Sequence, residues 1–395
     1  MSLAVSSSHA SQRNSLRIIA VMFFFMYAGI GIYFTFIAVY FHNAGLSGTQ
    51  IGLINMSSGI LAFFSSTLWG YLSDRTGRPQ WILAFAAGAS AMIALLMVLG
   101  HSFLFFLAVS CLYAVFNTAI VTLMDSTALA LLGENRADYG RYRVGGTFGF
   151  IVTTLTVGFI FERIGLVWMF PFFSLLMAFF VFAALRLPQM PVQVAHADRS
   201  NAAILKMVRQ PGWLVFAVTI FIVWFAGSGA ISFLSVALRG MGANDSLIGF
   251  VACSAAVFEV PFMAFNRQIM RKLGSRNMLL LSTLGYILRI GGYSLIPAPA
   301  WGIAVNAFNG ISYVFLWNAA IQFANENAPD HLKATAQGLF VSTTALAGVA
   351  SSVASGWLFD TLGPPGLFRV LALVCFSATI IFGIWGRKPI QALEI

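Results

Sequence analysis

Long apolar segments recur along nearly the whole chain and are separated by short polar ones. A helix that crosses the hydrocarbon core of a bilayer needs about 20 predominantly apolar residues. By this criterion the pattern predicts twelve spans, at 18–41, 49–72, 81–100, 103–132, 141–162, 166–186, 213–238, 246–266, 278–296, 300–325, 335–359 and 366–386. We therefore expect an all-α membrane protein with twelve transmembrane helices in a lipid bilayer.

The longest polar interruption, residues 187–212, divides these spans into two sets of six. Short motifs repeat across the two sets: Gly29-Ile30-Gly31 recurs as Gly227-Ser228-Gly229, Ile51-Gly52 as Ile248-Gly249, and Gly77 as Gly274. The nearly constant offset along the chain indicates two pseudo-symmetric six-helix bundles. The expected order is an N-terminal tail (1–17), a first bundle (18–186), a linker (187–212), a second bundle (213–386) and a C-terminal tail (387–395).

The basic residues are distributed unequally between the two predicted faces of the membrane. Of 22 Lys and Arg residues, eighteen fall on the face that carries both termini, and the other face has Arg163, Arg239 and Arg369. The positive-inside rule then predicts two cytoplasmic termini and a place in the cytoplasmic (inner) membrane. The same distribution explains the formal charge of +10 without a basic patch, so no nucleic-acid partner is expected.

Two pairs of opposite charges lie within predicted spans. Asp125 and Arg143 are equally far from residue 134 in the link between their spans, and Glu259 and Arg289 are equally far from Gly274. In an antiparallel hairpin each pair would reach equal depth. A charged residue within a membrane span is costly and indicates function, although the pairs could instead only lock helices together.

The link between the second and third spans reads GYLSDRTGRPQ and resembles the signature loop of the major facilitator superfamily. The matching residues are Gly70, Asp74, Arg75, Gly77 and Arg78. The resemblance implies the major facilitator fold, alternating access between two bundles, and a gating role for this loop on the cytoplasmic side. A charged turn with no gating role is the alternative.

A narrower resemblance is carried by the segments Tyr139–Arg143, Phe258–Pro261, Leu288–Arg289 and Ala334–Leu339. These are similar to the branch that holds lactose permease, 3-phenylpropionate transporters and nucleoside–proton symporters. The resemblance implies that Asp125 and Arg143 bind substrate, that protons are coupled, and that the protein is a monomer. Phe150 takes the place of a sugar-stacking Trp, so the resemblance does not imply a galactoside substrate.

The tenth span departs from several relatives, which carry a His there. Here Asn306, Asn309 and Tyr313 share one helical face and could bind substrate or form hydrogen bonds between helices. All five His residues fall in predicted tails or loops. Proton coupling is therefore expected to rest on Glu259, beside Arg289, or on Asp125.

No enzyme, cofactor or metal site is expected, since the chain has no phosphate-binding glycine loop, metal-spaced His/Cys cluster or Ser-His-Asp set. Together with the charged pairs, the resemblance implies a secondary active transporter that imports a small polar organic solute, such as a nucleoside, sugar or aromatic acid, by proton symport. A proton-coupled exporter of drugs or lipids and a non-transporting membrane receptor are the alternatives.

Overall fold

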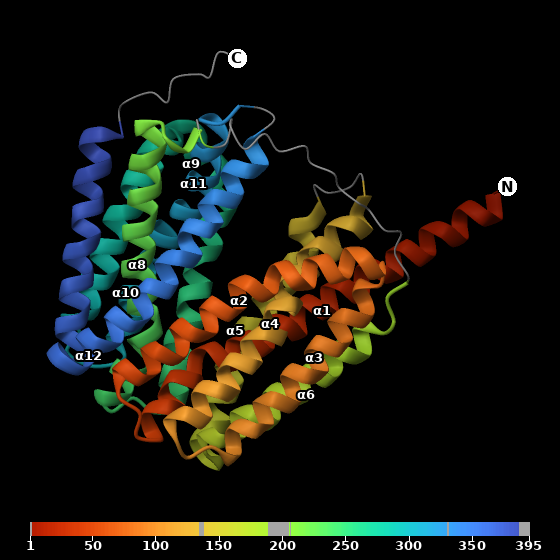
Figure 1. Cartoon of the computed structure of the whole chain (residues 1–395), viewed down its shortest axis with the longest axis horizontal. Helices are drawn as coiled ribbons and strands as arrows, with labels where there is room; N and C mark the ends of the chain where they lie inside the picture. The colour runs from red at the N-terminus through yellow and green to blue at the C-terminus, as the bar shows by residue number, and fades with distance from the viewer. Residues whose placement is uncertain (1, 134–137, 189–204, 206, 330–331, 387–395) are drawn as a thin grey trace. The chain divides into compact units, whose positions relative to one another are not determined.

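The computed structural model describes residues 2–133, 138–188, 205, 207–329 and 332–386, and side chains from residue 15 onward (Figure 1). The predicted linker lies largely outside these residues, and the predicted C-terminal tail lies entirely outside them. Regular structure in the described part of the chain is helical, as the apolar pattern predicts. Nine helices within those ranges are long and apolar enough to cross a membrane.

The first half of the chain forms six long helices. They are α1 (Ser2–Asn43), α2 (Gly48–Thr76), α3 (Pro79–Leu96), α4 (Phe103–Leu132), α5 (Tyr139–Ile164) and α6 (Met169–Ala184). Helix α1 begins within the expected polar tail, and its last turn contains the exposed His42, which was expected in a loop. Short 3₁₀ turns, η1 (Met97–Leu99) and η3 (Leu166–Trp168), adjoin α3 and α6.

The second half also contains six apolar segments, but its helices are less regular. Its helices are α8 (Pro211–Gly240), α9 (Asp245–Tyr293), α10 (Trp301–Val305), α11 (Phe315–Glu326) and α12 (Lys333–Trp385). Helices α9 and α12 each join two expected spans through a non-helical glycine, at Gly274 and Gly363. The expected span 300–325 consists of α10, the 3₁₀ turn η4 (Asn306–Phe308), the π-helix η5 (Gly310–Val314) and α11. The predicted all-helical membrane fold is confirmed and the twelve apolar segments are helical, with breaks at Gly274 and Gly363 inside α9 and α12; the exact count of twelve separate helices is not confirmed.

The chain forms two compact units. Unit 1 consists of Met1–Leu46, Ser57–His196 and Asn244–Cys253, and unit 2 of Ser47–Met56, Ala197–Ala243 and Ser254–Ile395. The first turns of α2 thus belong to unit 2, and the first turns of α9 to unit 1. The domain boundaries expected from the sequence remain a prediction.

Within unit 1, α1 packs against α5 and α6, and α3 packs against α4 and α6. Within unit 2, α8 packs along α12 (Figure 1). Small residues permit the close approach of α1 to α5: a Cβ at Gly149 would lie 2.3 Å from the carbonyl oxygen of Phe24, and one at Gly145 would lie 2.9 Å from that of Ala20. Such small-residue contacts bring helix backbones together in membranes, where lipid is as apolar as the side chains.

The backbone supports the internal repeat. Glycines with positive φ occur in matched pairs at Gly45 and Gly242, Gly77 and Gly274, and Gly165 and Gly363. Each pair is separated by the same offset as the sequence motifs, to within one position. Glycine adopts positive φ without the steric penalty that a Cβ imposes, so these pairs place equivalent turns in the two halves.

Candidate functional site

The first predicted pair, Asp125 and Arg143, lies in a cluster with two tyrosines in unit 1. The Tyr139 hydroxyl donates to Oδ1 of Asp125 at 2.7 Å. Nη2 of Arg143 donates to the Tyr27 hydroxyl, and its guanidinium carbon lies 4.2 Å from the centre of the Tyr27 ring. Tyr27 also lies within electrostatic reach of Asp125. The structure therefore brings the two charges into one cluster and gives each a tyrosine hydroxyl.

Close helix packing positions this cluster. Arg143 and Tyr139 occupy the first two turns of α5, and Tyr27 lies on α1. A Cβ at Gly146 would lie 2.5 Å from Cδ2 of Tyr27, so the absence of a side chain at this position makes room for the ring. Asp125, Arg143, Tyr27 and Tyr139 are all partly exposed.

Phe150 lies two turns further along α5. Its ring packs near Gly31 of α1, where a Cβ would lie 3.3 Å from Cδ2 of Phe150. The side chain is partly buried and belongs to unit 1, as do Asp125 and Arg143. A stacking role for Phe150 remains a prediction.

The second predicted pair, Glu259 and Arg289, belongs to a hydrogen-bonded network in unit 2. Arg289 donates through Nη1 to Oδ1 of Asn309, and Asn309 donates through Nδ2 to Oε1 of Glu259 at 2.5 Å. Arg289 is 6% exposed and Asn309 is 3% exposed. A buried charge requires such partners, and here a neutral carboxamide links the base to the acid.

Asn306 and Tyr293 extend this network. Nη2 of Arg289 donates to Oδ1 of Asn306 at 3.2 Å, and Nε donates to the Tyr293 hydroxyl at 3.0 Å. The Tyr293 hydroxyl in turn donates to Asn306, whose Nδ2 donates to Ser254 at 3.1 Å. The side chains come from α9 and from the irregular segment between α10 and α11.

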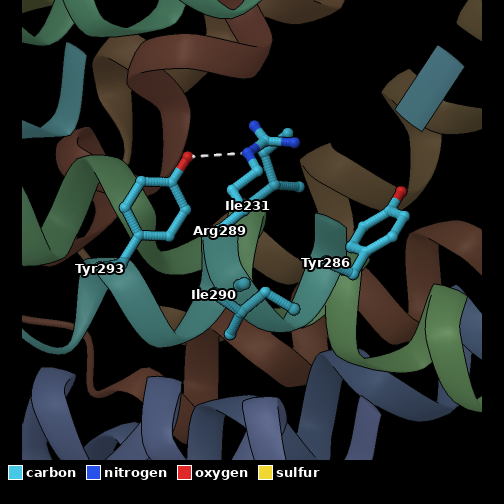
Figure 2. A pocket seen from close by; sticks show the side chains of 7 residues that line it. Ile231, Tyr286, Arg289, Ile290 and Tyr293 are labelled. Carbon is cyan, nitrogen blue, oxygen red and sulfur yellow. Dashed lines mark hydrogen bonds between the residues drawn. The ribbon is translucent and has the colours of Figure 1, made fainter. Parts of the chain in front are cut away.

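A small pocket in unit 2 borders the network. Figure 2 shows Arg289 between Tyr286 and Tyr293, with the bond from Arg289 to Tyr293 drawn. Ile231 of α8 and Ile290 of α9 supply apolar walls. The pocket therefore combines aromatic and aliphatic surface with a guanidinium.

Tyr313, the third predicted residue of the tenth span, lies in an aromatic group with Trp224 and Trp317. The ring centre of Tyr313 lies 6.1 Å from that of each tryptophan, and the tryptophan centres lie 5.6 Å apart. All three side chains are partly exposed. The expected common face thus divides into a polar part at Asn306 and Asn309 and an aromatic part at Tyr313.

The signature-loop residues form a tight turn between two helices. Asp74 and Arg75 lie in the exposed last turn of α2, and Arg78 precedes Pro79, the first residue of α3. Gly77 has φ of 63° and donates its N–H to the Ser73 carbonyl at 2.9 Å. The glycine in this motif is required by the turn. The gating role expected for Gly70, Asp74, Arg75, Gly77 and Arg78 remains a prediction.

Sequence reasoning did not find Tyr27, Tyr139, Tyr293 or Ser254 as members of these clusters. Tyr139 entered only through a resemblance, although it lies one helical turn before Arg143, which places the two on the same face of α5. Tyr27 and Arg143 are separated by 116 residues, so spacing alone could not pair them. Within the described ranges, no group of three or more His, Cys, Asp or Glu residues lies close enough to hold a metal ion.

Helical bundles with charged and polar side chains inside apolar spans are typical of membrane transporters. The family model "MFS_1 like family" matches residues 16–370. The chain therefore belongs to this family of the major facilitator superfamily. It is a membrane protein of the transporter class and not an enzyme.

Individual relatives agree with this assignment. The chain is 28% identical over 322 residues to the maltose permease of Geobacillus stearothermophilus, with 81% of each chain covered. It is 24% identical over 378 residues to the probable 3-phenylpropionic acid transporter of Escherichia coli, covering 93% of this chain and 97% of the relative. The crystal structure of the nucleoside transporter NupG matches with a TM-score of 0.78 at 17% identity, covering 93% of this chain and 99% of that one. The likeness to the NupG structure shows the fold alone.

Proposed function

We propose that this protein is a secondary active transporter that imports a small polar organic solute together with a proton by alternating access. The solute is a nucleoside, a sugar or an aromatic acid. These are the kinds of cargo suggested by the names of the relatives. Because those names belong to other proteins, the argument for this chain rests on its own polar clusters.

The observation that carries the proposal is the buried guanidinium of Arg289 with its acceptors. Arg289, Asn306 and Asn309 present a cation and neutral amides within apolar helices. A network built only for stability could be replaced by apolar packing, because burying charge costs desolvation free energy. Amides and a guanidinium suit the hydroxyl, carbonyl and carboxylate groups of small organic solutes.

We infer that the unit 1 cluster also binds the solute. Asp125 accepts hydrogen bonds and Arg143 donates them, so together they match a solute with both kinds of group. Phe150 and the group around Tyr313 supply aromatic faces for a ring. Glu259 is proposed as the protonation site, since a carboxylate beside a basic network can change charge when its partners move.

The membrane placement proposed here follows the distribution of basic residues. Both termini then lie in the cytoplasm, the protein resides in the inner membrane, and the ends of α2 and α9 that carry Gly48 and Asp245 face outward. A monomer is proposed, as the resemblance to the lactose permease branch implies.

Export of drugs or lipids is the second candidate, and a specific observation favours it. The group of Trp224, Tyr313 and Trp317 offers partly exposed aromatic surface, which suits bulky amphiphiles as well as small aromatic solutes. Direction of flux separates the two candidates. A symporter uses an inward proton gradient to accumulate its cargo inside the vesicle, and an exporter lowers the concentration of the cargo inside.

Ligand binding provides the test. A bound ligand raises thermal stability by mass action, so purified protein is heated with nucleosides, sugars, aromatic acids and cationic drugs. The proposal expects stabilisation by one class of polar solute and its loss in Arg143→Ala. Stabilisation by bulky amphiphiles alone, unchanged in Arg143→Ala, would favour the exporter.

A further inference from the structure

Two carboxylates outside the proposed substrate site occupy equivalent places in the internal repeat. Glu162 lies in the last turn of α5, and Asp360 lies at the end of the first of the two helical segments that make up α12. Glu162 lies one helical turn before Gly165, and Asp360 lies equally far before Gly363; both glycines have positive φ. The two carboxylates are therefore separated by the same offset as the two glycines, so the repeat relates them.

Asp360 binds the beginning of α2 within unit 2. Its Oδ1 accepts from the N–H of Gly48 at 2.6 Å, and its Oδ2 accepts from the N–H and the hydroxyl of Thr49, each at 2.7 Å. The first N–H groups of a helix have no intrahelical acceptor and carry partial positive charge. A carboxylate therefore binds strongly at this position.

Glu162 binds the beginning of α9 within unit 1 in a similar way. Its Oε1 accepts from Nδ2 of Asn244 at 3.0 Å, and its Oε2 accepts from the hydroxyl of Ser246. Ser246 follows Thr49 by the offset of the repeat, so the two hydroxyl donors are equivalent. Both contacts thus consist of a carboxylate, a hydroxyl and the start of a helix.

The local backbone around the two contacts also matches. The N–H of Gln50 donates to Oγ of Ser47 at 3.2 Å, and the N–H of Leu247 donates to Oδ1 of Asn244 at 2.9 Å. These are helix N-caps, and Ser47 and Asn244 are again related by the offset of the repeat. The repeat therefore preserves the cap together with the carboxylate contact.

Glycines bring the same helices into backbone contact next to each carboxylate. A Cβ at Gly52 of α2 would lie 2.3 Å from the carbonyl oxygen of Ser352 in α12. A Cβ at Gly249 of α9 would lie 2.3 Å from the carbonyl oxygen of Thr154 in α5. The start of α2 is thus held on α12, and the start of α9 on α5, by close packing and a carboxylate.

We propose that Asp360 and Glu162 are paired positioning residues that hold these helix starts in place while the transporter is closed to the outside and release them when it opens. We call the two contacts the carboxylate clasps. The inference rests on the proposed alternating access and orientation. Because the clasps are equivalent in the repeat, opening releases both, and weakening either one shifts the whole protein toward the open conformer.

Cys253 is a native reporter of this opening. It lies on α9 two turns after Ser246, is 4% exposed, and its thiol is hydrogen-bonded to Thr154 of α5. In a chain in which Cys111 and Cys375 are replaced by Ala, a membrane-impermeant maleimide added from outside reacts with Cys253 when α9 leaves α5. The rate of alkylation then measures the population of the open conformer.

The decisive variant is Asp360→Asn. Asp360 belongs to unit 2 and Cys253 to unit 1, so faster alkylation of Cys253 in this variant would show that weakening one clasp also releases the other. Loss of a charge-assisted hydrogen bond at an exposed position is expected to raise the alkylation rate about three- to tenfold. Glu162→Gln is expected to raise it similarly, and Asp360→Glu to restore the original rate. Thr49→Val, which removes one hydroxyl donor, should act in the same direction with smaller effect and serves if Asp360→Asn fails to fold.

Glu326→Gln is the matched control. Glu326 is an exposed carboxylate of unit 2 that likewise accepts from a serine hydroxyl, that of Ser275, and from an amide, that of Gln322. Cys253 in the Glu326→Gln variant should be alkylated at the same rate as Cys253 in the parent protein. If the alkylation rate of Cys253 rises in Glu162→Gln but not in Asp360→Asn and Thr49→Val, the clasps are only local contacts and the proposal is overturned. An equal rise of this rate in Glu326→Gln would also overturn it. The labelling needs no substrate, so its outcome is independent of the binding and uptake assays.

Discussion

Arg289 is linked to Glu259 through the side chain of Asn309. The carboxamide accepts from the guanidinium through Oδ1 and donates to the carboxylate through Nδ2. An amide in this place gives the acid and the base a shared neighbour. It can therefore transmit a change at Glu259, such as protonation, to the buried Arg289.

Asn309→Ala is expected to lower the free energy of unfolding by about 1–3 kcal/mol, because it removes one acceptor from the buried Arg289. The quantity is measured by thermal or denaturant unfolding in detergent. Asn318→Ala is the control, since Nδ2 of Asn318 donates to the Val314 carbonyl of its own helical segment. An equal decrease in the free energy of unfolding in both variants would show that the hydrogen bond to Arg289 contributes no more than an ordinary one.

Glu259→Gln is expected to abolish accumulation driven by a proton gradient and to retain counterflow exchange of the solute. Glutamine keeps an oxygen that can accept from Asn309 but cannot gain or lose a proton at neutral pH. Both activities are measured in proteoliposomes, with Glu326→Gln as the control. Proton-driven accumulation that persists in Glu259→Gln would exclude this residue as the protonation site.

Tyr27→Phe is expected to raise the half-saturation concentration for uptake about three- to tenfold. The ring can still lie against the Arg143 guanidinium, but the hydroxyl that accepts from Nη2 is lost. The guanidinium is then less well oriented for the solute. Tyr71→Phe, at a side chain that is 60% exposed, should change nothing. An unchanged half-saturation concentration in both Tyr27→Phe and Arg143→Ala would show that the unit 1 cluster has only a structural role.

Gly149→Ala is expected to destabilise the protein by about 1–3 kcal/mol, because its Cβ would meet the Phe24 carbonyl oxygen at 2.3 Å and force α5 away from α1. Gly70→Ala is the control: a Cβ there meets nothing within 4 Å, and alanine favours a helix by up to about 1 kcal/mol. Melting temperatures of the two variants should therefore shift in opposite directions. A similar loss in both would contradict the packing described for α1 and α5.

The apolar pattern predicted the class of fold because each bilayer span must be long and apolar, and this requirement is visible residue by residue. It also placed the turn between the charges Glu259 and Arg289 at Gly274, where φ is 73°. The break expected between the spans 335–359 and 366–386 falls at Gly363, where φ is 68° and the backbone is not helical. The irregular course of the span 300–325 was not predicted; a Cβ at Gly310, where its π-helix begins, would collide with the Phe262 ring.

The candidate site could be predicted only in part. Charge within an apolar span identifies Asp125, Arg143, Glu259 and Arg289 without a structure. The hydrogen-bond partners Tyr27 and Tyr293 are ordinary tyrosines in the sequence, and only the packing of helices makes them neighbours of the charges. Glu162 and Asp360 lie at the ends of spans, where acids are unremarkable, although the offset of the repeat could have related them.

The central claim is that this chain imports a small polar organic solute with a proton. The most direct test is uptake by proteoliposomes of labelled nucleosides, sugars and aromatic acids, with and without an inward proton gradient. Our account predicts accumulation of one of these classes above equilibrium only when the gradient is present, and its loss in Arg143→Ala. Gradient-driven depletion of the vesicle contents, or uptake that the gradient does not change, would contradict it.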